Sequence, residues 1–368
     1  MLRGFLLAGA ATLALALTTA MPARADILIG AAGPVTGGNA ALGAQQVNGA
    51  QLAVSDLNAK GGLLGQKIKL EIADDACDPK QAVSVANKLA TEGAVFVAGH
   101  LCSSSSIPAS KVYAEEGILI ITPASTNPKF TDEGSWNTFR VCSRDDQQGK
   151  LAGHTLATEF KDKKVVILHD NSTYGKGIAD ETKKNMNAAG KQEVLYTAYV
   201  PGERDYSALI SRLKQVGAEV AYIGGYHSEI GLIARQAKEQ GLKLQIIGAD
   251  ALTTNEYWQV AGEAGEGTMF SYAADVSKRP TAQAVVKEFT EKGIKPEGFA
   301  LFTYAAIQVW ADAVQKAGTV DAHKVAETLK SGGPWDSILG PVKYDQKGDV
   351  TTVDYVWYAW HDGNYAER

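Results

Sequence analysis

The chain alternates short apolar runs with amphipathic runs almost without interruption, and it does so in two successive series. The first series extends from residues 27–33 (ILIGAAG) to 118–125 (ILIITPAS), and the second from 165–171 (VVILHDN) to 268–274 (TMFSYAA). The apolar runs have the length of strands, and the intervening runs have the apolar spacing of helices. Helices that join uniformly apolar strands are typical of parallel sheets covered on both faces. We therefore expect an α/β fold with two doubly wound, Rossmann-like lobes.

The other runs complete this pattern. Further strands are expected at residues 70–76, 94–100, 194–200, 220–226 and 244–250. Two helical runs, 280–293 and 299–318, follow the second series. Because they must return to one of the two lobes, a lobe is not required to be continuous in sequence.

The first 25 residues have the composition of a secretory signal peptide. They contain Arg3, an apolar run over residues 5–17, and the small residues Ala23 and Ala25 before the expected cleavage site. The run is too short to span a bilayer comfortably, and polar residues and a proline break it, which disfavours the alternative of an uncleaved anchor. We expect the mature chain to begin at Asp26 and to be a soluble protein of the periplasm.

Charge and motifs exclude several classes of function. The chain has 36 basic and 41 acidic residues, a net charge of −5 and no basic run, so we expect no nucleic-acid partner. It contains no phosphate-binding loop, dinucleotide fingerprint or nucleophile elbow, and its 6 histidines lack metal-ligand spacing. We therefore expect no metal, no cofactor and no enzymatic activity.

A row of serines at residues 103–106 leaves the alternative of a hydrolase with an unfamiliar motif. A nucleophilic serine needs a histidine base within hydrogen-bond reach. His100 is close in sequence, but its side chain is expected to point away if Leu101 and Cys102 continue an extended chain.

Two of the 3 cysteines follow consecutive strands of the first series. Cys77 follows one strand and Cys102 the next, so both are expected at the same carboxyl edge of a parallel sheet. In an exported protein such a pair favours a disulfide, which would constrain the unfolded chain by about 3.5 kcal/mol. Cys142 is then expected to be a free, buried thiol.

Polar residues stand where the strands end, which is where ligands bind in open parallel sheets. The first lobe offers hydroxyl groups from residues 103–106, Ser125 and Thr126. The second lobe offers two aromatic residues and one acid: Tyr174, Tyr226 and Asp250. Hydroxyl groups beside helix N-termini suit a carboxylate, and a single aspartate suits an ammonium group. Each residue alone is also typical of a helix cap or a packing contact, but together they predict a ligand cleft between the lobes for a free α-amino acid.

Five stretches carry a family resemblance: DDACDPKQAVSVANK, GHLCSSSS, EEGILIITPAST, YIGGYHSEIG and YDQKGD. They resemble stretches of the branched-chain (leucine/isoleucine/valine) amino-acid binding proteins, which belong to the periplasmic type I binding proteins of ABC transporters. The likeness runs in register from about Ile27 to near Trp360. It implies two lobes joined by three crossings, the Cys77–Cys102 disulfide, a free L-amino acid as ligand and inner-membrane ABC permease subunits as partners.

The lobe limits expected under this resemblance divide the chain as follows: signal peptide 1–25; first lobe 26–144 and 274–352; second lobe 145–273 and 353–368. We expect a monomer. An alternative function is a periplasmic sensor subunit that reports the amino acid to a membrane signalling partner. Both functions need the same cleft, and uptake lost on deletion of the permease alone would favour transport.

The resemblance implies a role for each residue of the first-lobe loops. Ser103 and Thr126 would bind the ligand carboxylate through their hydroxyl and backbone N–H groups. Ala124 would offer its carbonyl oxygen to the ammonium group, with Ser125 adjacent in the same loop. Leu101 would form an apolar wall.

The other implied contacts come mostly from the second lobe. Tyr174 and Tyr226 would cover the ligand on closure, and Asp250 would receive the ammonium group. Phe299, an aromatic residue between the lobes in sequence, would touch the side-chain pocket.

Two positions depart from the family pattern. Leu42 stands where the family commonly has an aromatic residue, and Asp250 stands where it usually has glutamate, which is one methylene longer. Both changes are expected to enlarge the pocket and to broaden its range of ligands.

Overall fold

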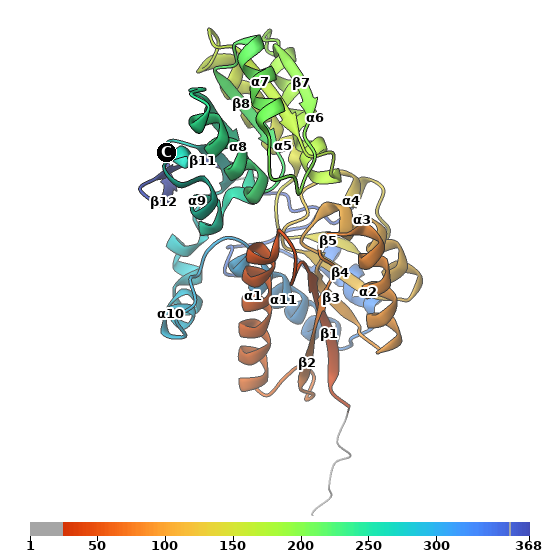
Figure 1. Cartoon of the computed structure of the whole chain (residues 1–368). Coiled ribbons are helices and arrows are strands. Elements are labelled where there is room, and N and C mark those ends of the chain that lie inside the picture. The colour runs from red at the N-terminus through yellow and green to blue at the C-terminus, as the bar shows by residue number, and fades with distance from the viewer. Residues whose placement is uncertain (1–24, 353–354) are drawn as a thin grey trace, which may run out of the picture.

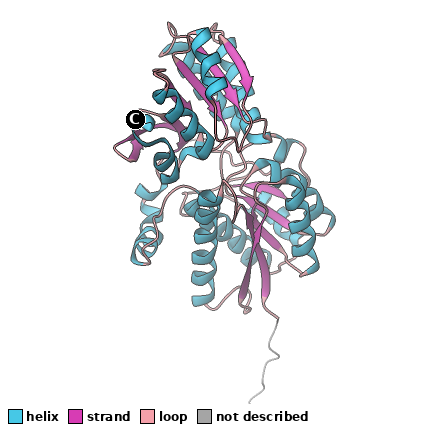
Figure 2. Ribbon diagram, viewed as in Figure 1, coloured by secondary structure: helices cyan, strands magenta, loops and turns pink. Residues whose placement is uncertain are grey.

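The computed structural model describes residues 25–352 and 355–368. The expected signal peptide, residues 1–25, lies outside the described residues apart from Ala25. Figure 1 shows two lobes, one above the other, each built around its own sheet. In each lobe, helices flank the sheet (Figure 2). The described part of the chain has no helix that is both long and apolar enough to cross a membrane.

The first lobe contains a five-stranded parallel sheet in the order β2-β1-β3-β4-β5. Its strands are β1 (Ile27–Gly33), β2 (Ile68–Asp74), β3 (Phe96–Gly99), β4 (Leu119–Thr122) and β5 (Thr138–Arg140). The central strands β3 and β4 are buried along their whole length, as the apolar runs predict. The short strand β5 was not expected, because its three residues TFR give no periodic signal.

Helices from both ends of the chain cover this sheet. They are α1 (Ala40–Ala59), α2 (Pro79–Thr91), α3 (Ser103–Glu115), α4 (Lys129–Asp132), α10 (Gln283–Glu291), α11 (Phe299–Ala317) and α12 (Ala322–Gly332). The two C-terminal helical runs expected from the sequence thus return to the first lobe, where α11 packs beside α1. The stacked rings of Phe96 and Trp310, 4.5 Å apart, hold α11 on the sheet.

The second lobe contains a seven-stranded sheet in the order β12-β11-β10-β9-β8-β6-β7. Its strands are β6 (Val165–His169), β7 (Leu195–Ala198), β8 (Val220–Gly224), β9 (Gln245–Gly248), β10 (Met269–Ala273), β11 (Tyr355–His361) and β12 (Asn364–Glu367). Its helices are α5 (Asp145–Thr158), α6 (Thr173–Ala188), α7 (Ser207–Val216), α8 (His227–Glu239) and α9 (Asn255–Ala261).

The expectation of purely parallel sheets is wrong for the second lobe. Strands β10 and β11, and then β11 and β12, pair antiparallel. Asp362 and Gly363 join β11 to β12 with positive φ angles of 46° and 80°, which suits a tight hairpin turn. An Asp-Gly pair between aromatic-rich runs is a hairpin signal, but it lies outside the alternation of strands and helices from which the fold was predicted.

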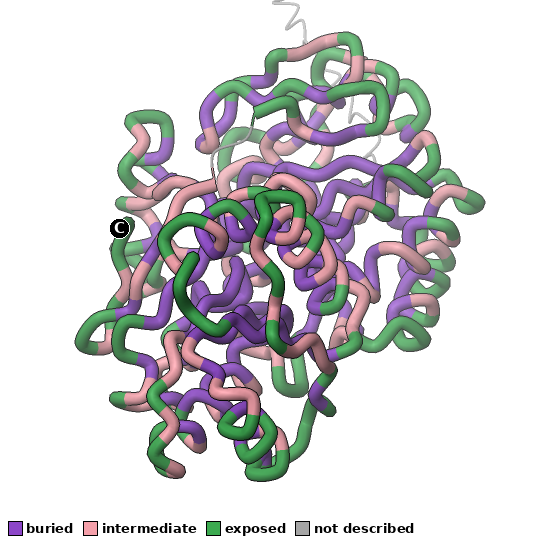
Figure 3. Tube along the Cα trace, turned by 90° about the horizontal axis from the view of Figure 1, so that it is seen from above, coloured by how far each residue is buried: buried purple, intermediate pink, exposed green. Residues whose placement is uncertain are grey.

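The chain passes between the two sheets three times. The passages lie between β5 and α5, after β10, and before β11, with residues 353 and 354 outside the described part. The expected lobe limits fall in these connections and remain a prediction. Seen from above, the buried stretches gather inside the molecule and the exposed ones form its periphery (Figure 3).

The cysteines are arranged as the sequence predicts. Cys77 and Cys102 form a disulfide with a Cα–Cα distance of 5.5 Å. Cys142 is free and buried. The disulfide ties the start of α3 to the loop after β2, and so fixes the first turn of the helix that carries Ser103.

Candidate ligand-binding site

A cavity of about 230 Å³ lies between the lobes, at the carboxyl ends of strands from both sheets. It is lined by Leu42, Leu101, Ser103, Ala124, Tyr174, Tyr226, Asp250, Ala251 and Phe299. Seven of the nine expected contact residues therefore line one cavity, joined by Leu42 and Ala251.

A second cavity of about 240 Å³ adjoins the first and shares Asp250 and Phe299 with it. Thr126 lines this second cavity, together with Cys142 and Tyr355. Ser125 lines neither of the two. Its hydroxyl donates to the carbonyl oxygens of His100 (3.2 Å) and Leu101 (3.0 Å), a structural role in the loop.

Ser103 is the first residue of α3, where backbone N–H groups have no helical acceptor. Its Oγ accepts a hydrogen bond of 3.3 Å from the Asn127 N–H, so the hydroxyl proton remains available for a ligand. The positive end of the helix dipole at this position favours a negative group. Ser103 is thus placed to bind a carboxylate.

Residues 124–127, named here the ligand loop, follow β4 and face Ser103. The Thr122 hydroxyl anchors the loop by accepting hydrogen bonds from the N–H groups of Ala124 (3.3 Å) and Ser125 (2.9 Å). Within the described residues, the Ala124 carbonyl oxygen accepts no hydrogen bond and the buried Thr126 hydroxyl makes no well-formed one. A buried polar group without a partner is costly, so these two atoms are suited to a polar ligand.

Asp250, at the end of β9, supplies the negative charge of the cavity. The Tyr174 hydroxyl donates a hydrogen bond of 2.6 Å to Asp250 Oδ1. Burial raises the pKa of the Asp250 carboxyl to about 6, although the hydrogen bond from Tyr174 opposes the shift. Asp250 forms no ion pair with the described residues, so a ligand ammonium group could supply its cationic partner.

A second buried acid, Asp145, lies close to Asp250 and was not predicted. Burial and the charge of Asp250 raise the pKa of Asp145 well above its ordinary value, while the nearby Thr126 hydroxyl opposes the shift. Neither carboxylate oxygen makes a well-formed hydrogen bond with the described residues. In the sequence, Asp145 looked like an ordinary acid in the first turn of a helix, so nothing marked it.

Two aromatic side chains from the second lobe close the cavity. The rings of Tyr174 and Tyr226 are 5.3 Å apart and both side chains are buried. Burial raises the pKa of both phenols, so they remain neutral. Phe299 and Leu101 face them from the first lobe as apolar walls.

Hydrogen bonds hold the two lobes together around the cavity. Gln45 of the first lobe donates through Nε2 to the Thr253 carbonyl oxygen (2.9 Å) and accepts through Oε1 from the Phe299 N–H (3.0 Å). Asn127 donates through Nδ2 to the Thr173 carbonyl oxygen of the second lobe (2.8 Å). The two lobes are therefore closed on each other. Nothing in the sequence indicated that Gln45 and Asn127 would bridge them.

His100 points away from the serine row, as expected. Its Nδ1 lies 2.5 Å from the Asp75 carboxylate and its Nε2 lies 3.0 Å from the Tyr113 hydroxyl. With both ring nitrogens engaged and the side chain buried, His100 does not serve Ser103 as a base. Among the described residues, the one cluster with metal-ligand geometry is an exposed surface group, Glu266, His361 and Asp362.

Several known proteins are similar to this chain. Residues 26–364 match the family model described as periplasmic binding protein. The chain is 49% identical to the Leu/Ile/Val-binding protein homolog 1 of Brucella suis, over 93% of this chain and 92% of the relative. It is 47% identical to an amino acid binding protein of Pseudomonas aeruginosa, over 96% of each.

Solved structures share the same fold. The leucine-binding protein of Thermotoga maritima superposes with a TM-score of 0.86 at 27% identity, over 93% of this chain and 97% of that one. A branched-chain amino acid transporter substrate-binding protein of Streptococcus pneumoniae, in complex with isoleucine, gives a TM-score of 0.83 at 26% identity, over 93% and 98%.

Proposed function

The chain belongs to the periplasmic binding protein family, and from this premise we propose that it binds a free aliphatic α-amino acid between its lobes and delivers it to an ABC permease in the membrane. The observation that carries the proposal is the division of the cavity. Carboxylate-binding groups lie on the first lobe, and an acid without a cationic partner lies on the second.

The carboxylate end is formed by Ser103 and Thr126. Hydroxyl and backbone N–H groups at the start of α3 and in the ligand loop bind the ligand carboxylate. The helix dipole and neutral donors stabilise the negative charge without placing a cation in the cavity.

The ammonium end is formed by Asp250 and the Ala124 carbonyl oxygen. An ammonium group has three donors, and these two acceptors offer partners on opposite sides of the cavity. The Tyr174 hydroxyl holds the Asp250 carboxylate in position from the other side.

The remaining walls decide which side chain fits. Leu42, Leu101 and Phe299 are buried and apolar, and the two tyrosine rings cover the opposite side. Such walls favour an aliphatic side chain over a charged one, because a charge there would lose its hydration without gaining a partner. The names of the relatives above, which include leucine, isoleucine and valine, support the same ligand class.

Binding is coupled to closure, because only the closed lobes present both ends of the site at once. A ligand that contacts both lobes stabilises the closed state by its greater affinity for it. The permease can then distinguish loaded from empty protein by shape.

Titration calorimetry tests the proposal. Protein that has been unfolded and refolded, to remove any bound ligand, is titrated with leucine, isoleucine, valine, alanine, threonine, phenylalanine, glutamate and a short peptide. Micromolar or tighter binding of the aliphatic members is the expected result. A folded protein that binds none of them would overturn the proposal.

A further inference from the structure

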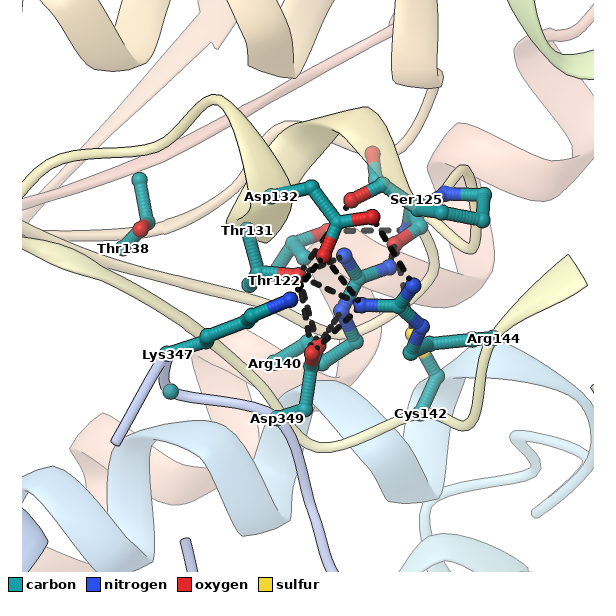
Figure 4. Close-up of polar contacts among 12 residues, drawn as sticks. Thr122, Ser125, Thr131, Asp132, Thr138, Arg140, Cys142, Arg144, Lys347 and Asp349 are labelled. Atoms are coloured by element: carbon teal, nitrogen blue, oxygen red, sulfur yellow. Dashed lines mark hydrogen bonds and ion pairs between the residues drawn. The ribbon is translucent and has the colours of Figure 1, made fainter. Parts of the chain in front are cut away.

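An ion-pair network lies directly behind the ligand loop (Figure 4). It centres on Arg140, the last residue of β5, whose side chain is fully buried. Arg140 donates through Nη1 to the Ser125 carbonyl oxygen (2.6 Å) and through Nη2 to the Asn127 carbonyl oxygen (3.1 Å). One guanidinium group thus holds the loop on both sides of Thr126.

These two hydrogen bonds fix the direction of the backbone at Thr126. In a trans peptide the C=O and N–H groups point in opposite directions. Because the Ser125 carbonyl oxygen points to Arg140, the N–H of Thr126 points away from it. The Thr126 carbonyl oxygen accepts from the Asp145 N–H (2.9 Å), and the N–H of Asn127 then donates to Ser103 Oγ. Among the described residues the N–H of Thr126 has no acceptor, so the loop presents this donor on the side opposite Arg140.

Asp349 holds Arg140 in turn. Its Oδ1 lies 2.6 Å from Arg140 Nε, and it is almost fully buried. The Thr131 hydroxyl bridges the pair, since it accepts from Arg140 Nη2 (2.8 Å) and donates to Asp349 (2.8 Å). Arg144 approaches the other oxygen of Asp349 (2.7 Å).

The turn that carries Asp349 is built to approach β5 closely. Asp345 Oδ1 accepts from the N–H groups of Lys347, Gly348 and Asp349. The Gly348 carbonyl oxygen accepts from the Arg140 N–H (3.0 Å), and a Cβ atom at this glycine would lie 2.0 Å from the Thr138 carbonyl oxygen. The YDQKGD motif (residues 344–349) does not line either cavity, and its turn brings Asp349 to Arg140.

We propose that Arg140 is a positioning residue for the ligand carboxylate, held in place by Asp349, and that the pair acts on affinity through the Thr126 peptide without touching the ligand. The inference rests on the proposed function. The pair lies beside two of the lobe crossings, because Arg140 ends β5 shortly before α5 begins and Asp349 precedes the passage to β11.

A ligand comparison distinguishes positioning from general structural support. Leucinamide has the ammonium group and side chain of leucine but a neutral amide in place of the carboxylate. If the pair positions the groups that donate to the ligand carboxylate, Asp349→Asn should lower the affinity for leucine about tenfold or more and the affinity for leucinamide much less. Equal weakening of both ligands, or no weakening of either, would overturn the proposal.

Further variants guard against misfolding and test the geometry. Arg140→Lys keeps the charge but cannot reach two carbonyl oxygens at once, so it should reproduce the selective loss; full retention of leucine affinity would contradict the role of the guanidinium fork. Thr131→Val removes the bridging hydroxyl and leaves both charges, and should give a smaller loss of the same kind. Lys347→Ala is the matched control, since this exposed cation contacts Asp132 and not the loop.

Hydrogen–deuterium exchange separates failure of this inference from failure of the proposed function. If wild-type protein binds neither ligand, the proposed function fails, but the exchange rates of the ligand-loop amides can still be measured. Peptides covering residues 123–130 and 143–148 should exchange faster in Asp349→Asn than in wild type and Lys347→Ala, with the core strand β8 unchanged. Unchanged exchange in both peptides would overturn the positioning role whatever the ligand.

Discussion

Tyr174 and Asp250, 76 residues apart in the chain, form a hydrogen bond of 2.6 Å inside the closed cleft. The phenol donates to Asp250, the one acid among the described residues that line the first cavity. Tyr174 therefore orients the carboxylate for a ligand ammonium group and partly offsets the cost of burying its charge.

Removal of this acid should strongly weaken binding. Asp250→Ala is expected to cost at least ~2 kcal/mol of binding free energy, because the ligand ammonium group would be left without its charged partner in a closed cleft. Calorimetry with leucine measures the loss. Asp250→Glu, which keeps the acid on a side chain one methylene longer, is the matched variant and should keep binding. Unchanged affinity in Asp250→Ala would remove Asp250 from the site.

The pH dependence of binding follows from the same residue. Burial raises the pKa of Asp250 to about 6 in the ligand-free closed state, so below this pH a proton competes with the ligand ammonium group. Affinity should fall as the pH drops below 6, by up to about tenfold per pH unit. Asp250→Asn should abolish this dependence, and a flat profile in wild type between pH 7 and 5 would contradict the assignment.

The stability of the ligand-free protein should vary with pH in the opposite direction. Because the folded pKa of Asp250 lies above that of the unfolded chain, its contribution is fully present below about pH 4 and is lost as the pH rises through about 6. The shift corresponds to a loss on the order of 3 kcal/mol. Denaturant unfolding of wild type and Asp250→Asn at pH 5 and pH 7 isolates this contribution. If the two proteins differ in free energy of unfolding by the same amount at both pH values, the pH-dependent contribution of Asp250 is excluded.

The breadth of ligands should depend on Leu42. This side chain is fully buried in the cavity wall, and the family resemblance leads us to expect an aromatic residue at this position. Leu42→Phe should reduce the space and narrow the range, with the largest losses for phenylalanine and isoleucine and the smallest for alanine. Calorimetry across the amino-acid panel gives the profile, and an identical profile would reject a role for this position.

The Cys77–Cys102 disulfide should stabilise the folded protein, whereas the free thiol of Cys142 should contribute no redox-dependent stability. Replacing Cys77 and Cys102 by serine opens a loop of 25 residues and should cost about 3.5 kcal/mol of unfolding free energy. Because Cys102 precedes Ser103, leucine affinity should fall as well. Cys142→Ala is the control. Because it keeps the disulfide, added reductant should lower its free energy of unfolding by the same amount as that of wild type. Equal stability of the serine variant and wild type would show that the bond contributes nothing.

The sequence allows most of the fold to be predicted because its two series of apolar runs are long and regular. The strands are shorter than the runs: the stretch 118–125 ends as a strand at Thr122, and its last residues become the ligand loop. Periodicity does not distinguish the strand residues from the loop residues that follow them, since a buried loop and a buried strand have similar composition. The hairpin of β11 and β12 was missed for a different reason, because its Asp-Gly turn lies outside the βα pattern.

The candidate site could be predicted from strand ends and from the family resemblance, residue by residue. Ser103, Tyr174 and Asp250 come together as expected. Asp145, Gln45 and Arg140 could not be predicted, because their importance comes from tertiary contacts with segments far away in the chain. A buried arginine or glutamine leaves no periodic trace in a sequence.

The central claim is that the two lobes recognise the two charges of one small ligand. It is tested most directly by calorimetry of the ligand-stripped protein with leucine, with 4-methylpentanoate, which lacks the ammonium group, and with isopentylamine, which lacks the carboxylate. The account predicts that leucine binds at least about a hundredfold more tightly than either analogue, because each analogue leaves one of the two lobes without its charged partner. An analogue that binds as tightly as leucine would contradict it.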